Sequence, residues 1–157
     1  MKSLLVLTGI VLTGVFTSKT VYKYQLRALT VPELITIAAE THKVEREHLS
    51  CILKIESEYR LNVVSNTRDH GIGQINERTA AGFKMDLNKL TTDLEYSIDK
   101  SAYMLSYYQW LKRHEEPRQW VCRYNVGPGP LTKASRGAKC EEYLERFNGC
   151  LTRGEYL

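Results

Sequence analysis

Apolar residues recur at helical spacing in several stretches of the chain, and this pattern predicts a mainly α-helical fold. The first helix is expected to begin at Thr30, which can cap it. Pro32 then fits the first turn, and Glu33 stands three residues after the cap, as in a capping box. The apolar face of this helix is formed by Leu34, Ile37 and Ala38.

A second helix is predicted from about Glu45 to Glu58, and it carries a carboxyl group on its apolar side. Its apolar positions are Leu49, Ile52 and Leu53, and Glu56 continues the same spacing. A carboxyl group on such a face is costly unless it is paired, protonated or functional. Glu56 is therefore the first candidate for chemistry.

The remaining pattern predicts further helices and little β structure. Residues 59–94 are richer in Asn, Gly, Thr and Asp and are expected to form mostly loops. The expected elements are a short hairpin around 63–75 and helices near 77–83, 96–114, 120–126 and 141–147. The sum is a mainly α, α+β class, in which a helical domain carries a small loop or β-hairpin region around 60–76.

The N-terminus differs from the rest of the chain, which divides it into residues 1–29 and a domain over 30–157. Residues 3–18 carry no charge and lie between Lys2 and Lys19. Sixteen residues are short for a membrane span of about 20 but suit the apolar part of an export signal. Because the cleavage signal at 15–17 is weak, we expect residues 1–18 to be an export signal or an anchor in the inner membrane. The protein is then periplasmic or associated with the envelope.

The charge pattern narrows the classes of partner. The net charge of +4 favours anionic partners such as a cell wall or a membrane surface. No block of Lys and Arg of the nucleic-acid-binding type occurs, so nucleic acid is not expected. No Cys-x-x-Cys or His-Glu-x-x-His spacing predicts a metal site, and no cofactor is expected.

The even number of cysteines predicts disulfides formed outside the cytosol. Four residues allow three pairings: Cys51, Cys122, Cys140 and Cys150. We prefer Cys140–Cys150, which closes a short loop over the C-terminal helix, together with Cys51–Cys122. The second bridge would join the Glu56 helix to the segment around residues 124–125.

Three segments carry residues suited to cleaving a sugar–sugar bond. Burial would raise the pKa of Glu56, so that it could protonate a glycosidic oxygen at neutral pH. Residues 71–76 combine two glycines, which allow tight turns and close approach of a ligand, with the amides of Gln74 and Asn76. Tyr124 and Asn125 precede a glycine-rich helix end.

Taken together, the segments Glu56-Ser57, 71–76 and 124–127 resemble the lytic transglycosylases of the soluble-transglycosylase, lysozyme-like type. The resemblance covers roughly residues 30–148 and implies that Glu56 is the sole catalytic acid and base. The substrate-binding positions it implies are Ser57, Gln74, Asn76, Tyr124 and Asn125. It also implies that a tyrosine of the C-terminal helix lies close to the catalytic Glu, and Tyr143 matches that tyrosine.

Two positions depart from this pattern. Gly73 stands where the family commonly has a second hydrophobic residue before the Gln. Asp69 matches the place where animal-type lysozymes carry a second catalytic carboxylate, although Asp also caps turns. We favour the structural role for Asp69.

The resemblance implies cleavage of the MurNAc–GlcNAc β-1,4 bond of peptidoglycan glycan strands, with a 1,6-anhydro product. The alternatives are a hydrolytic lysozyme that uses Glu56 and Asp69, and a non-catalytic peptidoglycan-binding structural component. Local opening of the wall suits a secretion apparatus or a phage virion, and the sequence does not separate these two settings.

Overall fold

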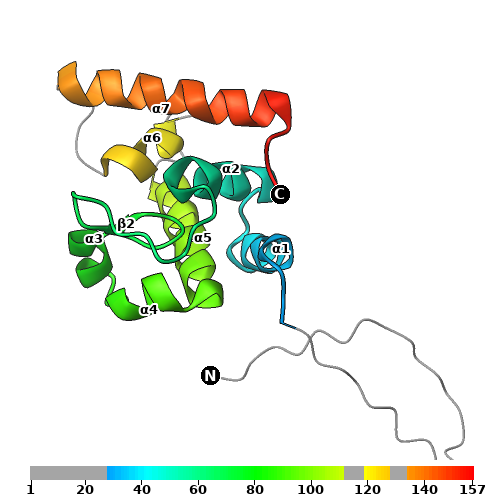
Figure 1. Cartoon of the computed structure of the whole chain (residues 1–157). Coiled ribbons are helices and arrows are strands. Elements are labelled where there is room, and N and C mark those ends of the chain that lie inside the picture. The colour runs from blue at the N-terminus through cyan, green and yellow to red at the C-terminus, as the bar shows by residue number, and fades with distance from the viewer. Residues whose placement is uncertain (1–27, 112–118, 128–133) are drawn as a thin grey trace, which may run out of the picture.

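The computed structural model describes residues 28–111, 119–127 and 134–157, which form the helical body in Figure 1. The expected leader at residues 1–18 and the expected end of the long helix near residue 114 lie outside the described residues. Within the described part of the chain, no helix is both long enough and apolar enough to cross a membrane.

Two N-terminal helices lie where the sequence predicts them. Helix α1 spans Val31–His42, and the carboxylate of Glu33 accepts hydrogen bonds of 2.8 Å from both the backbone N–H and the hydroxyl of Thr30. Helix α2 spans Arg46–Ser57 and buries its apolar face completely. It ends at Glu58, which adopts a left-handed conformation with φ of 54°.

The middle of the chain holds three further helices, α3 (Glu77–Gly82), α4 (Leu87–Thr92) and α5 (Leu94–Leu111). The sequence pattern missed α4, because its composition of Asn, Lys and Thr around two leucines is typical of a loop. A local signal exists in Asp86, which caps α4 by accepting hydrogen bonds from two backbone N–H groups. Helix α5 packs against α1, α2, α4 and α6, and is the centre of the domain.

A small antiparallel sheet confirms the expected hairpin. Strands β1 (Asp69–His70) and β2 (Ile75–Asn76) pair with Asp69 opposite Asn76. The strands and the turn between them, residues 69–76, are called the hairpin below. The hydroxyl of Ser57 donates a 2.7 Å hydrogen bond to the carbonyl of Ile72, which ties the hairpin to the end of α2.

The two glycines of the hairpin serve close packing within the protein. A Cβ at Gly71, where φ is 75°, would overlap the Leu90 carbonyl, and one at Gly73 would overlap the Ser101 hydroxyl. The sequence predicts that these glycines allow the close approach of a ligand. In the structure, the atoms that approach them belong to the protein itself. The glycines let the hairpin backbone lie directly against α4 and α5.

After α5, the described residues form two further helices, α6 (Gln119–Val126) and α7 (Ala134–Arg153). In Figure 1, α7 runs across α6 and α2, and it packs against both. Helix α7 is much longer than the expected 141–147. The residues that precede 141 are largely polar and basic, so the apolar pattern of the sequence did not extend to them.

Both disulfides bind α7 to another helix, and the preferred pairing is wrong. The bonds are Cys51–Cys150, from α2 to α7, and Cys122–Cys140, from α6 to α7. Cys140 and Cys150 lie ten residues apart on one helix, which separates them by about 15 Å along its axis. A disulfide requires Cα atoms roughly 4.4–6.8 Å apart, so these two residues could not pair.

Replacing Gly73 with Ala should destabilise the fold by about 1–3 kcal/mol, because the new methyl group overlaps the Ser101 hydroxyl. Urea denaturation measures this change. Gly82→Ala is the matched control, since a Cβ there meets no atom within 4 Å, and it should be neutral or stabilising by up to about 1 kcal/mol. Equal midpoints for the two variants would contradict the close packing of the hairpin.

Candidate active site

The carboxyl group of Glu56 lies in the last turn of α2, beneath α7. It accepts a 2.6 Å hydrogen bond from the hydroxyl of Tyr143. One turn further along α7, Nη2 of Arg146 donates a 2.9 Å hydrogen bond to the carbonyl oxygen of Ile55. These two bonds fix the position of Glu56 relative to α7.

Burial raises the pKa of Glu56 to about 7. The hydrogen bond from Tyr143 and the positive charge of Arg146 act in the opposite direction, and the negative charge of Asp69 adds to the rise. Loss of hydration outweighs the two stabilising contacts. A carboxyl group with a pKa near 7 can donate and accept a proton at neutral pH, as a general acid or base must.

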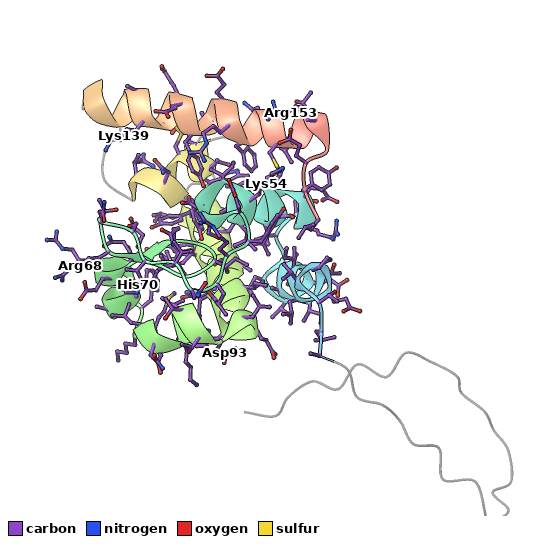
Figure 2. The ribbon with its side chains drawn as sticks, in the orientation of Figure 1. Lys54, Arg68, His70, Asp93, Lys139 and Arg153 are labelled. Carbon is purple, nitrogen blue, oxygen red and sulfur yellow. A yellow bond between two sulfur atoms is a disulfide. The ribbon has the colours of Figure 1, made fainter. Side chains whose placement is uncertain are left out.

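Glu56 opens into a cleft of about 720 Å³ between α7 and the hairpin. The lining residues come from α2, the hairpin and the loop before it, and helices α3, α5, α6 and α7: Glu56, Thr67, Asp69, Gln74, Ile75, Asn76, Arg78, Thr79, Met104, Tyr108, Tyr124, Asn125, Val126, Gly127, Lys139, Glu142, Tyr143 and Arg146. In Figure 2, Lys139 on α7 and Arg68 beside β1 lie on the same side of the molecule. The cleft is large enough for more than one sugar unit.

Asp69 borders this cleft, but its carboxylate is held by its own loop. Ser65 donates a 2.8 Å hydrogen bond to it, as does the amide of Asn76, and the Thr67 hydroxyl donates a third. Burial raises the pKa of Asp69, but these hydrogen bonds outweigh burial and lower it overall. Asp69 therefore stays ionised and organises the loop before the hairpin.

The two amide side chains of the hairpin also make internal contacts. Nε2 of Gln74 donates to the carbonyl oxygens of Gly71, at 2.9 Å, and Val63, at 3.3 Å, which fixes this side chain at the cleft wall. The amide oxygen of Asn76 caps α3 by accepting from the backbone N–H of Arg78. Both residues line the cleft, and Asn76 is more fully engaged in holding the loop.

Helix α6 contributes Tyr124 and Asn125 to the opposite part of the cleft. The Tyr124 hydroxyl donates a 2.9 Å hydrogen bond to the carbonyl oxygen of Gly73 and so anchors the hairpin to α6. Burial raises the pKa of Tyr124, which keeps the phenol protonated. Asn125 is exposed at the cleft, with its side chain accessible to a ligand.

Ser57 is the expected binding residue that lies outside the cleft lining, because its buried hydroxyl is directed to Ile72. Conversely, sequence reasoning overlooked the cleft residues Lys139 and Arg146. Lys139 lies four residues before Tyr143 and Arg146 three residues after it, which places all three on one face of a helix. This spacing indicates a shared face only if the helix extends back beyond Lys139, as α7 does. Within the described residues, no group of three or more His, Cys, Asp or Glu side chains is placed to hold a metal ion.

Comparison with known families agrees with this geometry. Residues 33–147 match the family described as Transglycosylase SLT domain. The match includes α1 through most of α7 and therefore every candidate residue discussed above. Comparison with curated protein sequences finds no significant match.

Glu56→Gln should stabilise the protein at high pH. The pKa of Glu56 is about 7 in the folded state against 4.5 ordinarily, so its favourable contribution is complete below pH 4.5 and is lost as the pH rises through 7. We expect the variant to gain about 1–3 kcal/mol in unfolding free energy at pH 8 and little at pH 4.5. Urea denaturation at both pH values measures this difference.

The exposed neighbour Glu58, changed to Gln, is the matched control and should show no comparable dependence on pH. If Glu56→Gln and Glu58→Gln behave alike at pH 8, the carboxyl group of Glu56 is not held in a protonated state by burial.

Proposed function

The chain belongs to the transglycosylase SLT domain family, whose members cleave glycosidic bonds in the glycan strands of peptidoglycan, and on this premise we propose that Glu56 is its single catalytic acid and base. The observation that carries the proposal is the state of the two cleft carboxyl groups. Glu56 has a pKa of about 7 and faces the cleft, whereas Asp69 is held ionised by three donors.

The proposed reaction breaks the β-1,4 bond between MurNAc and GlcNAc. Glu56 protonates the glycosidic oxygen, and GlcNAc leaves as an alcohol. The N-acetyl group of the substrate stabilises the positive charge at C1. The Glu56 carboxylate then takes the proton from the C6 hydroxyl, whose oxygen bonds to C1 and forms the 1,6-anhydro ring. The proton balance closes on Glu56 without a water molecule.

The residues around Glu56 suit each step of the proposed reaction. The Tyr143 hydroxyl, 2.6 Å from Glu56, stabilises the carboxylate that exists between the two proton transfers. Gln74, Tyr124 and Asn125 line the cleft, where the exposed amide of Asn125 and the amide oxygen of Gln74 suit the sugar hydroxyls and N-acetyl groups. The Tyr124 phenol, which donates to the carbonyl of Gly73, holds the wall of the cleft. Ser57 and Asn76 hold the hairpin, and their part in binding is to place Gln74.

A hydrolytic lysozyme mechanism and a purely structural role both fit the site less well. The first requires Asp69 to act on the sugar, yet its carboxylate oxygens already accept hydrogen bonds from Ser65, Thr67 and Asn76. The second does not require a partly buried acid with a raised pKa, which costs stability without contributing to binding.

We place this activity in the cell envelope, where the substrate is found. Two disulfides are typical of proteins that fold outside the cytosol, and residues 1–18 would serve as export signal or inner-membrane anchor. Local opening of the wall suits a secretion apparatus or a phage virion.

Digestion of purified sacculi should yield products lighter by one water than the hydrolysis products, as measured by mass spectrometry. Glu56→Gln should lower the rate by at least about 1,000-fold while the fold is retained, because both proton transfers of the proposed reaction use the carboxyl group of Glu56. Asp69→Asn should stay within about 10-fold of the parent and give the same anhydro products. Reducing-end products, or loss of all turnover in folded Asp69→Asn, would instead indicate the lysozyme mechanism.

Tyr143→Phe should move the pH profile upwards. The hydrogen bond from Tyr143 lowers the pKa of Glu56, so its removal raises that pKa. The fall in rate on the alkaline side, where Glu56 loses its proton, should therefore shift to higher pH. Tyr103→Phe, on the exposed side of α5, is the control. An unchanged profile in Tyr143→Phe would show that this hydrogen bond does not govern the acid.

A further inference from the structure

The face of α7 that borders the cleft carries two basic residues, one before Tyr143 and one after it. Lys139 lies about one turn before Tyr143 and Arg146 about one turn after it, and all three line the cleft. Figure 2 shows Lys139 in the N-terminal part of α7, away from Arg153. Neither Lys139 nor Arg146 has a role in the proton transfers described above.

Arg146 is held in place by a bond to the backbone next to the acid. Its Nη2 donates to the carbonyl oxygen of Ile55, the residue before Glu56, at 2.9 Å. A guanidinium group has five N–H donors in one plane, and a pair of them matches the two oxygens of a carboxylate. Because one end of the group is already anchored, less conformational freedom is lost when a ligand binds to the remaining donors.

We propose that Arg146 binds a carboxylate of the substrate beside the scissile bond, and that Lys139 extends this cationic strip along α7. The inference rests on the proposed cleavage of peptidoglycan and adds a determinant of specificity to it. The lactyl carboxyl group of muramic acid is a free carboxylate only where no stem peptide is attached, because the peptide is joined to it by an amide bond. A stem peptide carries carboxylates of its own. Either source presents the same chemistry to Arg146.

The acidic residues of the cleft are compatible with this role. Asp69 is occupied by donors from its own loop, so it does not compete for Arg146. Glu142 also borders the cleft from α7 and opposes the approach of an anion. The selectivity therefore comes from paired hydrogen bonds to one guanidinium group and not from a broad positive field.

Binding at Arg146 also affects the acid. The positive charge of Arg146 lowers the pKa of Glu56 in the free protein. A substrate carboxylate paired with Arg146 offsets that charge, so Glu56 holds its proton more firmly in the complex. The alkaline fall of kcat, which reports the complex, should then lie at higher pH than that of kcat/KM, which reports the free enzyme.

The test compares three preparations of the same glycan: strands freed of peptides, strands whose lactyl carboxylates have been converted to neutral amides, and strands that retain stem peptides. Dissociation constants are measured in the inactive Glu56→Gln protein with and without Arg146→Gln. We expect Arg146→Gln to weaken binding about 10- to 100-fold on carboxylate-bearing strands and less than about 3-fold on amidated strands. A loss on peptide-free strands identifies the lactyl carboxylate, and a loss confined to peptide-bearing strands identifies the peptide.

Two further variants and the parent enzyme complete the design. Arg146→Lys retains the charge and should recover part of the lost affinity, whereas Arg153→Gln, on the same helix and paired with Glu155, should leave it unchanged. Unfolding midpoints identify any loss of fold. An equal loss of affinity on charged and amidated strands would overturn the inference, while the mass of the parent's products tests the proposed function separately.

Discussion

The contact between α7 and the end of α2 is the constraint on which the site depends. Three bonds define it: the Cys51–Cys150 disulfide, the hydrogen bond from Tyr143 to Glu56, and that from Arg146 to the carbonyl of Ile55. Without α7, the side of Glu56 that α7 covers would be open to water, and hydration would lower its pKa towards the usual range. The same contact therefore creates the acid and one wall of the cleft.

The hairpin forms the other wall, and its position is set by helices rather than by its own two short strands. Ser57 binds the carbonyl of Ile72 from α2, and Tyr124 binds the carbonyl of Gly73 from α6. Glycines at 71 and 73 allow this close approach. Several residues expected to grip sugar thus position Gln74 through the backbone. This division of roles is physically reasonable, because a binding amide on a mobile turn would lose affinity to conformational entropy.

Stability and chemistry oppose each other at Glu56. A partly buried carboxyl group costs free energy once it ionises, and the proposed reaction requires that ionisation. The two disulfides stabilise the packing that buries Glu56, because both join α7 to the helices beneath it. A disulfide typically contributes about 2–4 kcal/mol to the free energy of unfolding, which is enough to offset the cost of ionising one buried carboxyl group.

Much of this arrangement follows from local features of the sequence. The capping box at Thr30, the apolar face that includes Glu56, and the glycine-rich segment before Gln74 depend on residues close together in the chain, so the periodicity of the sequence predicts α1, α2 and the hairpin. The alignment of these motifs with one family likewise agrees with the match over residues 33–147.

The tertiary structure alone decided which distant residues meet. The pairing of Cys51 with Cys150, the donors that hold Asp69, and the position of Arg146 beside the acid all depend on how α7 and the loops fold back on α2. Local periodicity carries no information on distances between segments a hundred residues apart, and a polar helix such as the first turns of α7 shows no apolar period at all. The sequence by itself therefore determined that Glu56 is an acid on a buried face, and the packing of α7 determined what that acid contacts.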